Sequence, residues 1–305
     1  MARLERSELA VPASNWDMIT KAVTSDADVV FLDLEDSVAP NEKVASRANV
    51  IRAVNELDWG TKPRLFRMNA LDTPFFYGDL VEVVEAAGDR LDLIMQPKAN
   101  RPEDVYVVET LLTQIEVHKG FARPVGLEVQ IETAEGLIHA PQIAKASRRI
   151  ETLIYGPGDY TASVRMPAVS IGSMDEWDAA YPGHRFHHVM HGILVAGRAA
   201  GIRVMDGPFA DFRDLEGYRR SCLLARSMGF DGKWCIHPSQ VSIANEVFSP
   251  TEQEITWARK VVDAYEVANR EGQGAVAVDN KMIDAASIKM AQVTLDQAGA
   301  AGLTG

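Results

Sequence analysis

The chain has little of what several protein classes require. It holds two cysteines, Cys222 and Cys235, in 305 residues, which are too few for a disulfide framework, so we expect a reducing compartment. Positive charge is in deficit, because 31 Lys and Arg face 43 Asp and Glu for a formal net charge of −12. Since nucleic acids and anionic membranes bind basic faces, this charge argues against both as general partners.

Long apolar runs are missing as well. The sequence has no stretch of about eighteen apolar residues, so we expect no membrane span. The segment MARLERSELAVPASNW lacks the long apolar core of a secretory signal. Internal repeats and low-complexity segments are absent too. With 47% hydrophobic and 24% charged residues, we expect a globular, cytoplasmic protein.

The sequence does show a regular alternation of predicted strands and predicted helices. Apolar, β-branched runs are separated by stretches with apolar residues at helical spacing, such as 42–57 and 214–229. Eight such runs are present, at 7–13, 28–36, 64–70, 91–98, 126–133, 152–159, 202–211 and 232–240. Alternating strands and helices predict parallel strands joined by right-handed crossovers, and eight units predict an α/β fold, a (β/α)₈ TIM barrel. A doubly wound sheet is the second interpretation, but its G-x-G-x-x-G loop is absent after the early strands.

The chain continues beyond the eighth unit. Past residue 240 the pattern predicts two helices broken at Ser249-Pro250, then a glycine-containing connector and a last helix. We therefore expect a catalytic barrel over residues 1–248. Residues 249–305 are expected to form a C-terminal helical arm that packs on a neighbouring subunit.

Polar groups gather where the predicted strands end. Active sites of this barrel lie at the carboxyl ends of its strands. Because unpaired charge near a core is costly, several charges converging there are better explained by an active site than by stability. The side chains concerned are Asp33, Glu35, Asp36, Arg67, Asn69, Lys98, Glu132, Asp159, Asp206 and His237.

Glu132 and Asp159 are the most informative of these. Each is reached by a short apolar run and is followed by small residues and a predicted helix start. Two carboxylates on neighbouring strand ends suit Mg²⁺, which leaves its other positions to water and substrate oxygens. The alternative is that both residues cap the next helices. The recurrence of polar strand ends favours the metal site.

Arg67 and the DLED segment form a second group. The guanidinium of Arg67 suits a carboxylate or enolate oxygen, and a salt bridge to Glu35 or Asp36 is compatible with that role. Asp33 and Glu35 are expected on one face of the second strand, with Asp36 at its end. These carboxylates suit three tasks: orienting Arg67 and Lys98, holding metal-bound water, or acting as a base. The sequence does not decide among them.

Histidines and the first loop give weaker signals. The segment GHRFHHVMH lacks the H-E-x-x-H spacing, so we interpret His187 and His191 as helix or loop residues rather than zinc ligands. His237 suits either a polar ligand or a hydrogen bond that braces the turn before Pro238.

The loop after the first strand begins a helix. Backbone N–H groups there suit an anion, and Lys21 follows one or two turns on. In the alternative, Ser14 or Asn15 only caps the helix.

Eight segments in order resemble the citrate lyase β-subunit-like family, within the HpcH/HpaI aldolase superfamily. They are DVVFLDLEDSVAP, FRMNALDTP, IMQPK, VQIETAEG, YGPGDY, DGPFADFRDLEG, GKWCIHPSQ and KMIDAASIKMAQ. The likeness runs from about Arg6 to Gln292. It is closest to the malyl-CoA/β-methylmalyl-CoA lyases, because the DGPF-D-F and GKW-IHP segments are typical of that branch.

This resemblance implies a function. Members are Mg²⁺-dependent oxo-acid-lyases, with Mn²⁺ as a substitute ion. They reversibly cleave L-malyl-CoA or β-methylmalyl-CoA to glyoxylate and acetyl-CoA or propionyl-CoA by retro-Claisen chemistry, as homotrimers or homohexamers that share active sites between subunits. The alternatives are a citramalyl-CoA lyase, a malyl-CoA thioesterase and a β-type subunit of a citrate lyase complex.

The resemblance also assigns residues. Glu132 and Asp159 correspond to the metal ligands, Arg67 stabilises the enolate, and Asp284 matches an acid/base supplied by a neighbouring subunit. Glu35 joins Arg67 and Asp284 in the predicted catalytic set. The predicted substrate and CoA contacts are Ala10, Val11, Pro12, Ala13, Ser14, Asn15, Lys21, Arg67, Lys98, Gly158, Asp159, Ile236 and His237.

Overall fold

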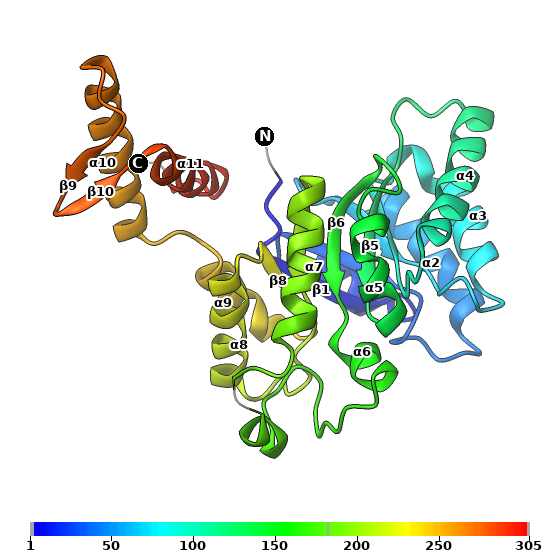
Figure 1. Cartoon of the computed structure of the whole chain (residues 1–305). Coiled ribbons are helices and arrows are strands. Elements are labelled where there is room, and N and C mark those ends of the chain that lie inside the picture. Colours follow the sequence, from blue (N-terminus) through cyan, green and yellow to red (C-terminus); the bar gives the residue numbers. More distant parts are fainter. Residues whose placement is uncertain (1–2, 182, 304–305) are drawn as a thin grey trace. The chain divides into compact units, whose positions relative to one another are not determined.

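The computed structural model describes residues 3–181 and 183–303 (Figure 1). Contacts divide the chain into two compact units. One spans Glu5–Asn245, and the other is built mainly from Glu246 onward. Within the described ranges, none of the helices combines the length and the hydropathy needed to cross a membrane.

Eight parallel strands close into a barrel in sequence order, and pairing of β1 with β8 completes the closure. The strands are β1 (Ser7–Pro12), β2 (Val29–Asp33), β3 (Arg64–Arg67), β4 (Leu93–Gln96), β5 (Gly126–Ile131), β6 (Ile150–Tyr155), β7 (Arg203–Asp206) and β8 (Gly232–Cys235). The predicted TIM barrel with a helical extension is confirmed. Two local expectations are wrong: β2 ends at Asp33, so Glu35 and Asp36 lie in the following loop, and β6 ends at Tyr155, so Asp159 lies in a helix that begins at Pro157.

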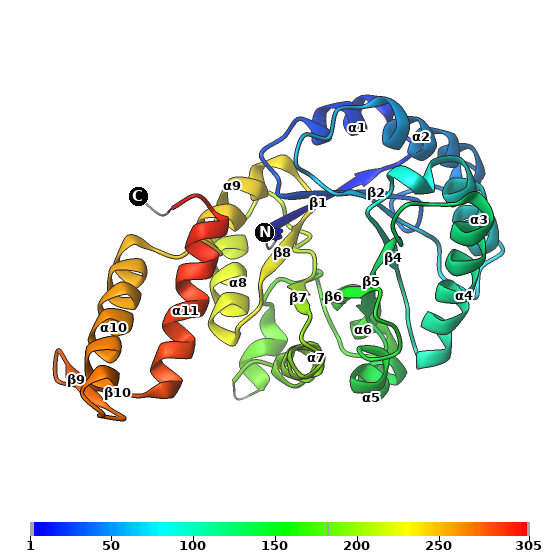
Figure 2. The same ribbon diagram turned by 90° about the horizontal axis from the view of Figure 1, so that it is seen from above.

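Helices follow the strands along the chain. In Figure 2, α1 and α2 lie outside β1 and β2, while α3 and α4 lie outside β4. The helices of this unit are α1 (Trp16–Val23), α2 (Lys43–Glu56), α3 (Phe76–Ala87), η1 (Gly88–Arg90), α4 (Pro102–Lys119), α5 (Ala134–Ile143), α6 (Pro157–Ser163), η2 (Glu176–Ala180), α7 (His187–Ala200), α8 (Leu215–Met228) and α9 (Pro238–Val247). Local chemistry sets their ends. Asn15 caps α1 by accepting from the N–H of Met18, and Gly120 ends α4 with a left-handed φ of 70°.

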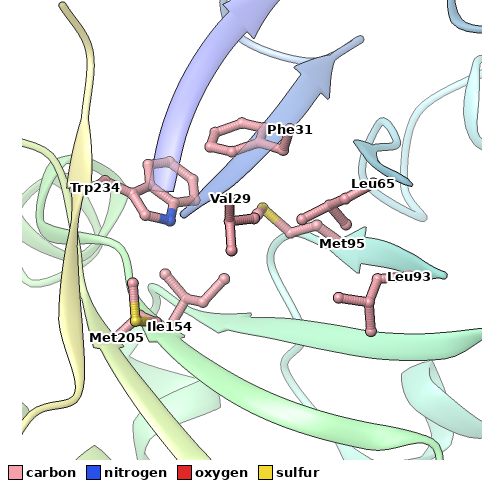
Figure 3. Packing of buried hydrophobic residues seen from close by; sticks show 8 residues of the cluster. All are labelled: Val29, Phe31, Leu65, Leu93, Met95, Ile154, Met205 and Trp234. Carbon is pink, nitrogen blue, oxygen red and sulfur yellow. The ribbon is translucent and has the colours of Figure 1, made fainter. Parts of the chain in front are cut away.

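Buried apolar side chains from the barrel strands pack together in one cluster (Figure 3). Its members are Val29, Phe31, Leu65, Leu93, Met95, Ile154, Met205 and Trp234. Each such burial contributes roughly 1.5–3 kcal/mol. Successive side chains of a strand point to opposite faces, so Asp33, two residues after Phe31, and Arg67, two after Leu65, share the face of this cluster. The alternation that places the core side chains inside the barrel therefore also points Asp33 and Arg67 inward.

The C-terminal unit pairs α10 (Glu252–Arg270) with α11 (Ala285–Ala300), which lie side by side in Figure 2. Thr251 and Glu254 form the capping box of α10. The glycine-containing connector folds into an antiparallel hairpin of β9 (Val276–Val278) and β10 (Lys281–Ile283). Its turn residues Asp279 and Asn280 take φ values of 46° and 61°, a conformation these residue types tolerate in hairpin turns.

Candidate active site

A cavity of about 390 Å³ opens beside the carboxyl ends of the barrel strands. Nine of the sequence-predicted site residues line it, namely Ala10, Pro12, Asp33, Asp36, Arg67, Glu132, Gly158, Asp159 and Ile236. The remaining lining residues are Met18, Ser37, Gln130, Gly156, Pro157, Ile171, Pro208, Ala210 and Trp234. The cavity lining thus combines charged side chains with apolar ones, as is common in small-molecule sites.

Arg67 is held in place by two neighbouring carboxylates. Its Nε and Nη2 donate to Oδ1 and Oδ2 of Asp33, each at 2.7 Å, and its Nη1 lies 2.9 Å from Oε2 of Glu35. Its guanidinium also lies 5.4 Å from the ring centre of Trp234. Burial works against the charge of Arg67, but Asp33 and Glu35 outweigh it and raise the pKa of Arg67 above its ordinary value. The side chain is therefore a permanently charged group in a fixed orientation.

Lys98 connects the carboxylates around the cavity. Its Nζ lies 2.7 Å from Oε1 of Glu35 and 3.6 Å from Oδ2 of Asp159. Its backbone N–H donates to Oε1 of Glu132 at 2.8 Å. Lys98 has a left-handed φ of 50°, which is uncommon and costly for a residue with a side chain other than Asn or Asp. Burial raises the pKa of Glu35 despite its two cationic neighbours.

Glu132 follows directly after β5 and is 2% exposed. The hydrogen bonds that it accepts come from neutral groups, the N–H of Lys98 and, at 3.3 Å, the amide of Gln130. Burial first, and then the charges of Glu35 and Asp159, raise the pKa of Glu132 to about 8. Gly156 gives this carboxylate room, because a Cβ there would stand 2.3 Å from Oε2 of Glu132.

Glu132 and Asp159 fit a hard divalent cation. Asp159 lies in the first turn of α6, its side chain is 38% exposed, and it lines the same cavity as Glu132. Within residues 3–181 and 183–303 there is no group of three or more His, Cys, Asp or Glu side chains arranged to hold a metal. A two-carboxylate site of this kind is typical of Mg²⁺, whose other positions go to water and substrate oxygens. A cation here would also offset the repulsion between the two carboxylates.

The first loop is tied into the barrel. The N–H of Ala13 donates to the carbonyl of Asp33 at 2.9 Å, and the N–H of Asn15 donates to that of Pro12 at 3.1 Å. Val11 and Ala13 are buried, whereas Lys21 is exposed on α1. Ser14 is half-buried next to the cap residue Asn15. The structure therefore brings Ala10 and Pro12 to the cavity and uses Asn15 as the helix cap.

The other predicted residues lie outside the cavity lining. His237 bonds through Nδ1 to the hydroxyl of Ser239 at 2.8 Å and stacks on Phe212, with ring centres 4.9 Å apart. Asp284 is the N-cap of α11 in the C-terminal unit and accepts from the N–H of Ser287 at 3.0 Å. This hydrogen bonding lowers the pKa of Asp284. His187 and His191 lie on α7 with stacked rings 5.4 Å apart.

Sequence reasoning missed part of the lining. Gln130 and Trp234 had a usable signal, because each lies on the inward face of a predicted strand. Ile171, Pro208 and Ala210 come from loops and have no periodic signal.

The fold and the site together define an α/β-barrel protein with an acidic, cation-fitting centre beside an anchored arginine. A model of the HpcH/HpaI aldolase/citrate lyase family matches residues 6–238, and the chain belongs to this family.

Individual relatives are similar over nearly the whole chain. The L-malyl-CoA/β-methylmalyl-CoA lyase of Cereibacter sphaeroides is 44% identical over 303 residues, covering 97% of this chain and 95% of that protein. The (3S)-malyl-CoA thioesterase of the same organism is 36% identical, with the same coverage of 97% and 95%. The crystal structure of CitE from Mycobacterium tuberculosis with magnesium, acetoacetate and coenzyme A superposes with a TM-score of 0.76 at 30% identity, covering 96% of this chain and 97% of that one.

Proposed function

We propose that the protein is a Mg²⁺-dependent carbon–carbon lyase. It reversibly cleaves a 3-hydroxyacyl-CoA, L-malyl-CoA or β-methylmalyl-CoA, to glyoxylate and acetyl-CoA or propionyl-CoA. The observation that carries the proposal is the buried carboxylate of Glu132, which shares the cavity with Asp159 and with the anchored guanidinium of Arg67. The similarity to a lyase with these substrates supports it.

The reaction needs a stable site for negative charge. The 3-hydroxyl gives its proton to the ionised carboxylate that we assign below as the acid/base, the bond between C2 and C3 breaks, and the electron pair remains on the thioester as an enolate. Arg67 offsets that charge, because its orientation is set by Asp33 before substrate arrives. Glu35 holds Arg67 and Lys98 in place from the loop after β2.

Glu132 and Asp159 would hold the cation and, through it, the oxo-acid half of the substrate. When bound, Mg²⁺ supplies Lewis-acid polarisation and chelation, and Mn²⁺ is the substitute that we expect to support activity. The bound ion would also align the breaking bond, which would lower the barrier. The cavity residues Ala10, Pro12, Gly158 and Ile236 then contact the acyl-CoA.

The enolate takes up a proton at C2, and in the condensation direction that proton is removed again. We assign this step to Asp284 of a second copy of the chain, in a homotrimer or homohexamer. Asp284 is ionised as the cap of α11, which suits the base of the condensation direction. Its role as a helix cap gives the residue a second, structural function.

The test is product identification. The purified protein is incubated with malyl-CoA, β-methylmalyl-CoA and citramalyl-CoA, each with Mg²⁺ and with EDTA, and the released 2-oxo acid is identified by mass spectrometry. Glyoxylate from the first two substrates, dependent on Mg²⁺, is the expected result.

Each alternative has its own outcome. Pyruvate from citramalyl-CoA alone indicates a citramalyl-CoA lyase, and free CoA with malate but no glyoxylate indicates a thioesterase. No turnover of any free acyl-CoA points to a citrate-lyase β-type subunit that needs an acyl-carrier partner. Any of these three results would overturn the proposal.

A further inference from the structure

Ile171 lies at the rim of the candidate active site, on the long segment between α6 and α7. Its Cδ1 would stand 3.1 Å from a Cβ on Gly158, so the side chain packs over the backbone next to Asp159. Ile171, Gly158 and Asp159 also line a second hollow of about 640 Å³, formed with residues 161–162 and 165–170. A branched apolar side chain therefore stands at the boundary of two hollows, beside a proposed metal ligand.

The backbone of Ile171 is fixed by the loop after β7. Its carbonyl accepts from the N–H of Ala210 at 2.9 Å. The next residue, Gly172, has a left-handed φ of 74°, and a Cβ there would stand 2.3 Å from the carbonyl oxygen of Pro208. Only glycine allows this approach without displacement. Ile171 is therefore held against the loop that supplies Pro208 and Ala210 to the cavity.

One arginine ties together the chain on both sides of Ile171. Arg185 donates through Nη1 to the carbonyl of Pro167 at 2.7 Å, and it pairs with Asp175 at 2.8 Å and Asp178 at 3.0 Å. Asp175 in turn accepts from the N–H of Val169 at 3.1 Å. The side chain of Arg185 is 6% exposed. These charge-assisted bonds bind the two flanks of the segment to each other and so limit how far Ile171 can move.

We propose that Ile171 sets the size limit for the group on the carbonyl carbon of the 2-oxo acid. The inference rests on the proposed function, because it takes the oxo acid to be held at Glu132 and Asp159. An acid held there lies beside Gly158, where its substituent meets Ile171. The hydrogen of glyoxylate fits without rearrangement, whereas the methyl group of pyruvate meets the side chain of Ile171, whose backbone is held by Ala210 and whose flanks are held by Arg185. A single methylene in such a pocket changes selectivity by about 10–200-fold.

The test compares Ile171→Ala with Val169→Ala. Val169 is on the same segment and lines the second hollow but not the active-site cavity, so it is a matched control for losing apolar atoms. With acetyl-CoA and Mg²⁺, kcat/KM is measured for glyoxylate and for pyruvate. The ratio for pyruvate over glyoxylate is expected to rise about tenfold in Ile171→Ala and to stay within about twofold of wild type in Val169→Ala.

A second readout separates this inference from the proposed function. Calorimetry gives the affinities of the Mg²⁺-loaded protein for pyruvate and glyoxylate without turnover. If wild type condenses neither acid with acetyl-CoA, the proposed function fails, and the change in the affinity ratio still decides the role of Ile171. An unchanged ratio in Ile171→Ala, with the same melting temperature as wild type, overturns the inference.

Two further variants grade the effect. Ile171→Val removes one methylene and is expected to shift the ratio in the same direction by a smaller factor. Arg185→Met releases the segment and is expected to raise the ratio while speeding hydrogen exchange over residues 167–178. Faster exchange with an unchanged ratio would overturn the positioning role of Arg185.

Discussion

Arg67 and Asp33 form a two-point ion pair at the end of the barrel strands, with Nε to Oδ1 and Nη2 to Oδ2 both at 2.7 Å. Both side chains are almost fully buried. Two parallel bonds fix the plane of the guanidinium as well as its position, which a single bond would leave free to rotate. This orientation determines where the positive charge points inside the cavity.

Asp33→Asn is expected to lower kcat about 10²–10³-fold, because Arg67 loses the partner that aims it at the developing charge. Steady-state kinetics on malyl-CoA measure this. Asp79→Asn is the matched control, since Asp79 is also a buried aspartate paired with an arginine, Arg47, but lies outside the cavity lining. Both variants should lose stability, and only Asp33→Asn should lose kcat in its folded fraction.

The same pair makes stability depend on pH. Burial alone would raise the pKa of Asp33, but the charge and hydrogen bonds of Arg67 outweigh burial and hold the pKa below its usual 3.8. The ionised carboxylate therefore stabilises the fold fully above the unfolded-state pKa, and this stabilisation is lost as the pH falls through the folded-state pKa.

Urea unfolding of wild type and Asp33→Asn at several pH values measures the effect. The difference in unfolding free energy should be constant from about pH 7 to pH 5 and should shrink below about pH 4. Breaking a buried pair costs about 3–5 kcal/mol at neutral pH. A difference that grows on acidification would contradict the assignment.

Glu132→Gln is expected to abolish tight Mg²⁺ binding and to lower kcat/KM by about 10³-fold, since several kcal/mol of charge stabilisation are lost. Without metal, the same variant should melt at a higher temperature than wild type above about pH 8, because a buried carboxyl whose ionised form is disfavoured by burial and by Glu35 and Asp159 is replaced by a neutral amide. Calorimetric Mg²⁺ titration and thermal melts in EDTA measure the two effects. Glu128→Gln, on the same strand but outside the cavity lining, should leave Mg²⁺ affinity unchanged.

Gly156→Ala is expected to displace Glu132, because the new Cβ would stand 2.3 Å from its Oε2. Overpacking of this kind costs about 1–3 kcal/mol, so both the melting temperature and the Mg²⁺ affinity should fall. Gly274→Ala is the control, since no atom of the described residues lies within 4 Å of its Cβ position. Equal Mg²⁺ affinity in the two variants would show that Gly156 does not position Glu132.

Cys222 and Cys235 are expected to be unreactive in the native protein. Burial raises the pKa of each thiol to about 12, so both stay protonated near neutral pH, and the thiolate is the reactive form. Titration with a thiol-reactive disulfide reagent at about pH 8 should detect no thiol in native protein and two after unfolding. Rapid reaction of either cysteine in folded protein would contradict this.

Part of the site follows from the sequence because it lies on strands or within a few residues of their carboxyl ends. The period-2 pattern of each apolar run gives the inward face, and the parallel arrangement brings all carboxyl ends together. That is why Arg67, Glu132 and Asp159 could be predicted to share a site. The loop after β2 illustrates the limit of this reasoning, because Glu35 continues the alternation in sequence but lies beyond the last paired residue of the strand.

By itself, therefore, the sequence determined the barrel, the polar strand ends and the family, since strand and helix periods are local properties of the chain. Only the tertiary structure decided that Asp33 accepts two hydrogen bonds from Arg67. It alone showed that Gly156 leaves room for the side chain of Glu132, and that the side chain of Ile171 packs against Gly158. These contacts join residues whose spacing follows no regular period. They depend on how the loops pack after the barrel closes, and no repeating pattern in the sequence encodes that packing.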